Sequence, residues 1–268
     1  MRKNAWVICC CTAVLAAFGT FFRWLQDQVC FEAETGLAVR GSIWPYAVAL
    51  MIVIAAVVLA VVCFRMKNQP HTSFPDSLPA AFAAAQRVRT IGGVVLGALL
   101  AVGGAWLMIS SGTLSSPGLQ RVLAVLAIVT GAAFARQMLA PGDAEATSGA
   151  VVCASMPIVL LAFWLIVSYK VNIINPTISA YAVEILALCA ALIAFYQLAG
   201  FAYGRPKAIK SIFWSQFAAF LCITALPDDR AGAQQLMLAA IAGILVFQSY
   251  LTASNIRPAV SGPVGGAQ

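Results

Sequence analysis

Long apolar runs dominate the sequence and restrict the structures that the chain can adopt. Eight of them have about the length that crosses a lipid bilayer as a helix, which is about 20 mostly apolar residues. They lie at about residues 5–22, 44–64, 91–111, 119–139, 150–169, 179–201, 209–226 and 231–251. Lipid permits only helices and closed barrels, and these runs are too long for barrel strands. The sequence therefore predicts an all-α integral membrane protein, a bundle of about eight transmembrane helices.

The composition agrees with a chain that is mostly surrounded by lipid. Of the 268 residues, 62% are hydrophobic and 9% are charged, whereas a soluble domain carries about a quarter charged residues. We expect residues 1–253 to form a single transmembrane domain, without a separate soluble domain. Residues 254–268 are rich in Pro, Gly and Ala, which predicts a disordered cytoplasmic tail. The Ala-rich residues 78–85 are expected to form a short helix on the membrane surface before the third span.

The basic residues indicate how the chain is oriented in the membrane. With the N-terminus in the cytoplasm, the inner segments hold Arg2, Lys3, Arg65, Lys67, Arg87, Arg89, Arg136, Arg205, Lys207, Lys210 and Arg257. The outer segments hold Arg23, Arg40, Arg121, Lys170 and Arg230. This excess of inner cations follows the positive-inside rule, and it predicts that both termini are cytoplasmic. The net charge of +7 is then a membrane feature, and we expect no nucleic-acid partner.

The first apolar run begins like a secretory signal peptide. Met1-Arg2-Lys3 precedes it, and Val14-Leu15-Ala16 is a passable cleavage site. The run continues past that site as far as Phe22, to about spanning length. This continuity favours an uncleaved first transmembrane helix.

One acidic residue falls well inside a predicted span. Glu184 lies about five residues into the sixth run, a depth at which an acid is costly unless it faces protein or water. Arg23, expected at the end of the first helix, and Lys170, expected at the end of the fifth, lie at a matching depth. Glu184 is therefore interpreted in two ways. It is either a proton or cation site with Tyr181 beside it, or a buried ion pair with one of these cations that fixes the packing of the helices.

Small residues form a stripe along the third run. Gly93, Gly97, Ala101 and Ala105 recur every four residues, and small side chains allow helix backbones to approach closely. The stripe predicts a packing face, either within the protein or between subunits of a homo- or hetero-oligomer.

Residues for catalysis or metal binding are scarce. His71 is the one histidine of the chain, too few for a zinc site. The eight cysteines include no Cys-x-x-Cys pair, and no protease, hydrolase or phosphate-binding motif occurs. We therefore expect no metal, no cofactor and no enzymatic activity.

Four stretches are similar to uncharacterised multi-pass membrane proteins of clostridial-type Gram-positive bacteria. They are FRWLQ at 22–26, FEAETGL at 31–37, YAVEILA at 181–187 and FYQLAGFAYGRP at 195–206. The resemblance implies a bacterial cytoplasmic membrane. It implies no activity and no particular site residue.

Two functions follow from these features as hypotheses. The first is a small-solute or ion transporter, or a membrane component of one, with Glu184, Arg23 and Tyr181 near an outward-facing polar site. The second is a non-catalytic scaffold or subunit that packs against a partner membrane protein through the small-residue stripe. A transporter should contain a hydrated cavity around Glu184, whereas a scaffold should hold Glu184 sealed by a cation.

Overall fold

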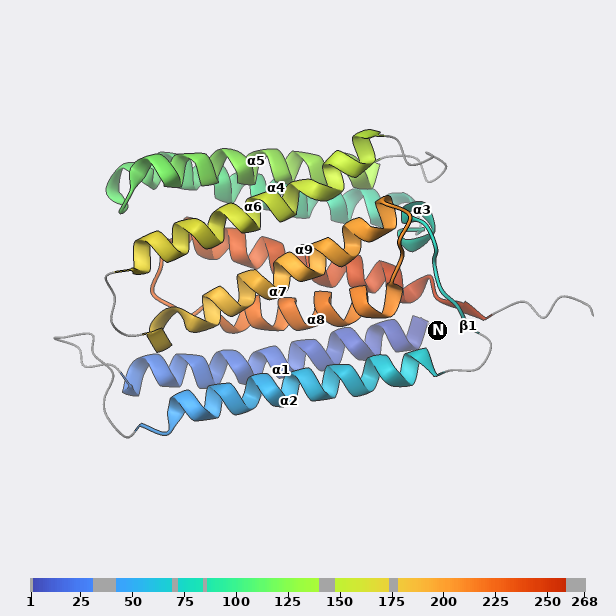
Figure 1. Cartoon of the computed structure of the whole chain (residues 1–268), viewed down its shortest axis with the longest axis horizontal. Coiled ribbons are helices and arrows are strands. Elements are labelled where there is room, and N and C mark those ends of the chain that lie inside the picture. The colour runs from blue at the N-terminus through green and yellow to red at the C-terminus, as the bar shows by residue number, and fades with distance from the viewer. Residues whose placement is uncertain are drawn as a thin grey trace, which may run out of the picture.

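The computed structural model describes residues 2–30, 42–68, 72–83, 86–139, 148–173 and 178–258, and it is almost wholly helical (Figure 1). The helices are α1 (Arg2–Val29), α2 (Trp44–Lys67), α3 (Leu78–Ala81), α4 (Gln86–Ser110), the 3-10 turn η1 (Ser111–Thr113), α5 (Pro117–Leu139), α6 (Ser148–Asn172), α7 (Ile178–Ala202), α8 (Ala208–Thr224) and α9 (Gly232–Ser254). Two short strands, β1 (Thr72–Ser73) and β2 (Arg257–Pro258), pair antiparallel. The prediction of an all-α chain with several apolar helices of spanning length is confirmed; the count of eight spans and the cytoplasmic termini stay predictions.

Within the described residues, seven helices are long and apolar enough to cross a membrane. They are α1, α2, α4, α5, α6, α7 and α9. Helix α8, the remaining predicted span, has 17 residues and is about 25 Å long, shorter than the hydrocarbon core of about 30 Å. It runs alongside the long helices (Figure 1), and most of its residues are buried.

The two ends of the described chain lie at the same end of the bundle (Figure 1). We call this end, which holds Arg2 and strand β2, the proximal end. The opposite end, where the chain turns from α8 into α9, is the distal end. Consecutive long helices run in opposite directions between them, which is the arrangement that short connections impose.

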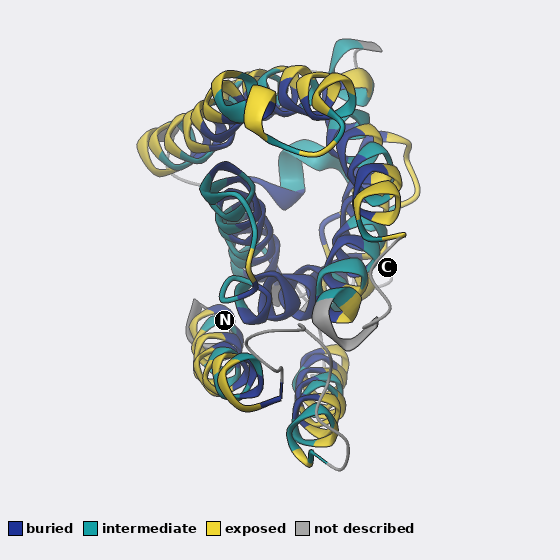
Figure 2. Ribbon diagram, turned by 90° about the vertical axis from the view of Figure 1, so that its left-hand side faces the viewer, coloured by how far each residue is buried: buried dark blue, intermediate teal, exposed yellow. Residues whose placement is uncertain are grey.

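Six helices form a closed ring, seen in Figure 2 along the bundle. Each helix from α4 to α9 packs against the next one in the chain, and α4 also packs against α9. Helices α1 and α2 lie outside the ring, where both pack against α8. As a result α8 is enclosed from several sides, while α2 is the least buried of the seven long helices.

Glycines bring α4 and α5 unusually close together. A Cβ atom on Gly97 would lie 2.5 Å from the carbonyl oxygen of Gly131, and a Cβ on Gly131 would collide with the carbonyl oxygen of Gly97. A Cβ on Gly93 would collide with the side chain of Met138. Lipid supplies no hydrophobic force between helices, so close backbone contact of this kind is a principal source of their association.

The predicted stripe of small residues therefore packs against α5 within the chain, but one of its four predicted residues does not take part. Ala105 is exposed. Gly104 continues the contact instead, because a Cβ on it would lie 2.8 Å from the carbonyl oxygen of Ala124. A strict spacing of four residues drifts away from the 3.6-residue turn of a helix, and a step of three from Ala101 to Gly104 restores the face.

The centre of the ring is filled with apolar side chains. A void of about 10 Å³ remains there, room for about one water molecule. It is lined by Leu100, Thr130, Phe134, Pro157, Leu160, Leu161, Phe195, Ile241 and Ile244. The described residues thus leave no space at this level for a solute larger than water.

Three sequence predictions are corrected by the fold. Helix α1 continues to Val29, so Arg23 lies inside the helix and not at its end. Within residues 78–83, the described part of the helix predicted at 78–85, only the four-residue α3 is helical; its Ala81 is buried and it packs against α7. The predicted disordered tail begins with strand β2, which pairs with β1; residues 259–268 lie outside the described part of the chain.

We predict that Gly131→Ala lowers the free energy of unfolding by about 1–3 kcal/mol or more, because the new methyl group overpacks the α4–α5 contact. Gly118→Ala in the same helix is the matched control, since a Cβ there meets nothing within 4 Å. In an open helical position Ala is favoured over Gly by about 1 kcal/mol, so the control should be unchanged or more stable. Thermal unfolding in detergent measures both, and equal stability of the two variants would contradict the close contact.

Candidate functional site

A buried arginine marks the distal end of the bundle. Arg23 in α1 is 1% exposed, and its Nε donates a hydrogen bond of 2.6 Å to Asp228 Oδ1. Its Nη1 donates to Gln26 Oε1 at 3.0 Å, and Asp27 lies 4.0 Å from its Nη2. Because α1 extends beyond the predicted apolar run, these polar residues share one continuous helix with it.

A second arginine reaches the same aspartate from the other side. Arg230 Nη2 lies 2.7 Å from Asp228 Oδ2 and 3.6 Å from Glu184 Oε2 in α7. We call Arg23, Asp228, Arg230 and Glu184 the distal charge cluster. It joins α1, α7 and the turn between α8 and α9, so it links the outer helix pair to the ring.

The backbone of this turn is held by a glutamine of α9. Gln235 Nε2 donates to the carbonyl oxygens of Leu226, at 3.3 Å, and of Asp228, at 3.2 Å. Asp228 is therefore fixed through both its main chain and its carboxylate. A shared carboxylate between two guanidinium groups compensates for part of the desolvation cost of each charge.

The distal charge cluster shows which cation lies next to Glu184. The structure gives Glu184 a cationic partner that the sequence analysis did not name, Arg230. Arg23 pairs with Asp228, Lys170 is exposed, and Tyr181 is half-buried. The Glu184 side chain is 12% exposed.

Sequence reasoning missed Arg230 and Asp228 because both were assigned to a solvated connecting turn. Their only sequence signal is the run Asp228-Asp229-Arg230 between two apolar segments. A short turn looks exposed in sequence, whereas in the fold the Asp228 and Arg230 side chains are each 6% exposed.

A second polar region lies inside the helix bundle, toward the proximal end. Gln216 in α8 is fully buried. Its Nε2 donates to Ser249 Oγ in α9 at 3.0 Å and contacts Cys9 Sγ in α1 at 3.4 Å. A side-chain amide thus ties three helices together, as is common between transmembrane helices and as expected for a glutamine in an apolar run.

Two serines of α8 point away from this link, toward the inside of the ring. Phe220 faces α1, because a Cβ on Gly19 would lie 3.0 Å from its ring. Ser211 precedes Phe220 by nine residues, or two and a half turns, so it points to the opposite side of α8. Ser215 follows Ser211 by four residues and shares its face. Both hydroxyls are buried without a hydrogen-bond partner among the described residues.

Gln248 of α9 lies on the side of its helix that faces the central void. It follows Ile244 by four residues and Ile241 by seven, and both isoleucines line the central void. Its Oε1 is buried and accepts no hydrogen bond from the described residues. We call Ser211, Ser215 and Gln248 the interior polar group; all three lie in the proximal half of their helices.

The distal charge cluster and the interior polar group offer charge pairing and hydrogen bonding. Among the described residues, no three His, Cys, Asp or Glu side chains gather as metal ligands. The distal charge cluster neutralises its own charges, while the interior polar group offers hydroxyl and amide oxygens without a charge.

The fold and these regions define a multi-pass helical membrane protein with polar groups inside a six-helix ring. Comparison with protein-family models, with curated proteins and with solved structures finds no match for the chain.

We predict that Asp228→Asn is the most destabilising removal of an acid in this region. It leaves Arg23 and Arg230 buried without their shared carboxylate, and breaking a buried pair typically costs about 3–5 kcal/mol. Glu184→Gln should cost less, because the variant removes one ion pair at the longer distance of 3.6 Å. Asp229→Asn, at an exposed neighbour, is the control and should stay within about 0.5 kcal/mol of wild type.

Thermal unfolding of the three purified variants beside wild type measures this order. If Glu184→Gln were more damaging than Asp228→Asn, Glu184 rather than Asp228 would be the centre of the cluster.

Proposed function

We propose that the protein is a small-solute or ion transporter, or a membrane component of one, whose pathway lies inside the ring formed by α4 to α9. The observation that carries the proposal is the interior polar group. Three polar side chains, Ser211, Ser215 and Gln248, are buried inside the ring with oxygens that no described residue satisfies.

Unsatisfied oxygens are costly in a membrane interior. A buried polar group without a hydrogen bond costs about 1–3 kcal/mol in proteins, and serine hydroxyls in helices usually find a backbone carbonyl to which they donate. A polar solute, an ion or water that passes through the ring would satisfy these groups.

Helix α6 has a feature that fits a ring that opens and closes. Pro157 lies in its middle and lines the central void, and a proline removes one helical hydrogen bond and favours a bend. Thr130 of α5 donates to the carbonyl oxygen of Met156 at 3.4 Å, so a weak side-chain bond joins the two helices at this point. Bending α6 here would widen the apolar central void, which lies next to the interior polar group on its distal side.

In this proposal the distal charge cluster closes the ring and does not itself bind the solute. Glu184 is paired with Arg230, and an acid whose charge is already compensated has little affinity left for a cation. The role first considered for Glu184, Arg23, Tyr181 and Lys170 as a solute site is thereby replaced by a structural role at the distal end.

A non-catalytic scaffold is the second candidate, and the close packing of the ring favours it. The central void measures about 10 Å³, and Glu184 is sealed by a cation, as expected for a scaffold. The stripe at Gly93 and Gly97 is occupied by α5, so a partner or second copy would have to contact another face. In both candidates we place the chain in a bacterial cytoplasmic membrane, with eight spans, cytoplasmic termini and no enzymatic activity.

We predict that Ser215→Cys, in a variant that lacks the native cysteines, reacts with a small, membrane-impermeant thiol reagent in proteoliposomes. Water must reach the interior polar group if it lies on a pathway. A variant that retains only Cys222, a fully buried residue of the same helix, is the negative control. Lys210→Cys, at an exposed position near the start of α8, is the positive control.

The rate of labelling, followed by mass spectrometry, distinguishes the two candidates. A rate for Ser215→Cys between those of the two controls supports a hydrated pathway. A rate as low as that of Cys222 would mean a dry ring, and the transporter proposal would then give way to the scaffold.

A further inference from the structure

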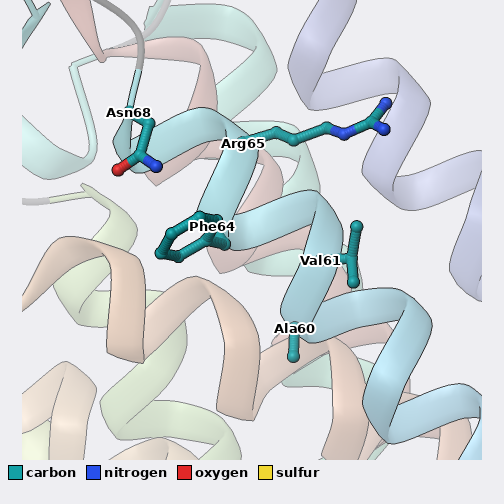
Figure 3. A pocket seen from close by; sticks show the side chains of 5 residues that line it. All are labelled: Ala60, Val61, Phe64, Arg65 and Asn68. Atoms are coloured by element: carbon teal, nitrogen blue, oxygen red, sulfur yellow. The ribbon is translucent and has the colours of Figure 1, made fainter.

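A large open hollow runs along the outer surface of α2 near its proximal end. Its volume is about 600 Å³, and it is lined by Ala60, Val61, Phe64, Arg65 and Asn68 (Figure 3). All five residues are exposed. The hollow lies outside the ring, on the helix of the seven long ones that is least covered by the rest of the protein.

The five residues form two neighbouring rows on one face of α2. Ala60, Phe64 and Asn68 are spaced by four residues, as are Val61 and Arg65, and the two rows of side chains diverge on either side of the helix in Figure 3. Along the helix axis the lining is apolar at one end and polar at the other. An elongated molecule that lies along this face would therefore need an apolar part and a polar part to match it.

The position of this change in polarity matches a membrane boundary. Residues 44–64 of α2 contain no charged side chain, and Arg65 is the first. The apolar wall formed by Ala60, Val61 and Phe64 thus belongs to the hydrocarbon core, while Arg65 and Asn68 lie about where lipid phosphates begin.

Arg65 is available to bind an anion. No carboxylate among the residues that the structure describes lies within ion-pair distance of its guanidinium group. A guanidinium group binds phosphate oxygens through two parallel hydrogen bonds.

We propose that this hollow binds one anionic phospholipid, with its phosphate at Arg65 and an acyl chain along the apolar residues Ala60, Val61 and Phe64. Charge complementarity selects the occupant, since a cation above an apolar wall fits an anionic headgroup above a hydrocarbon chain. A partner protein or second copy would have to bring both an acid and an apolar helix to the same place, and its presence is one outcome of the test below. The inference is independent of any transport activity.

The experiment uses the full-length protein, purified in detergent and mixed with phosphatidylglycerol or phosphatidylcholine of identical acyl chains. Native mass spectrometry counts the lipids retained, and thermal unfolding measures the stabilisation that each lipid gives. We expect tighter binding of phosphatidylglycerol by wild type. Arg65→Gln should weaken that binding about fivefold, which corresponds to the contribution of one arginine near an anionic lipid.

Lys67→Gln is the matched control. Lys67 is a cation at the end of the same helix and is exposed, but it does not line the hollow. The control should retain the wild-type preference for phosphatidylglycerol. Phe64→Ala should weaken the binding of both lipids, because it removes apolar wall without changing the charge.

Two kinds of result would overturn the proposal. One concerns charge: equal binding of the two lipids by wild type would show that the anionic headgroup is not selected, and equal loss in Arg65→Gln and Lys67→Gln would make the effect one of general charge. The other is a cysteine introduced at Val61 that crosslinks two copies in liposomes while phosphatidylglycerol has no effect on the yield, since the hollow would then be a protein interface. Arg65→Gln and Lys67→Gln both change exposed side chains, so we expect both variants to fold. The thermal unfolding curves verify this directly.

Discussion

The bundle depends on how closely its helices approach one another, because lipid supplies no hydrophobic force between them. Lipid chains are as apolar as the side chains they contact, so association must come from backbone proximity, good packing and hydrogen bonds. The mutual contact of Gly97 with Gly131 supplies the first of these. It brings α4 against α5, and α4 in turn packs against α9, which closes the ring.

Charge pairing fixes the distal end of that ring to the outer helices. Asp228 accepts from Arg23 on α1 and from Arg230 on its own turn, and Arg230 reaches Glu184 on α7. Four buried charges that compensate one another connect elements that are far apart in the chain. The interior polar group differs in that it carries no charge; its Ser215 and Gln248 oxygens, like Arg230 Nε and Nη1 in the charge cluster, are buried without a hydrogen-bond partner among the described residues. This difference in charge is why we propose a structural role for the first region and a transport role for the second.

Residue patterns predicted the helices well and their side-chain partners poorly. Apolar runs located all of the long helices, since spanning length and absence of charge are local properties of a sequence. The depth of Glu184 was also readable, and with it the need for a partner. The identity of that partner was not, because Arg230 is 46 residues further along the chain and reaches Glu184 through a turn that looks solvated in sequence. The role of Ser211 and Ser215 was equally hidden, because a serine in an apolar run carries no sign of whether its hydroxyl is satisfied.

The sequence by itself determined the class of the protein, the number and approximate positions of its apolar segments, and the presence of an acid and small residues within them. These follow from the fact that a membrane selects for hydropathy and length, which are read along the chain. Only the tertiary structure decided three further points. The Gly93–Gly97 stripe packs against α5, α8 is the ring helix that contacts both outer helices, and Asp228 rather than Glu184 is the centre of the charge cluster. Those outcomes depend on which helix faces meet, and helix faces are matched by packing between distant segments, which hydropathy does not encode.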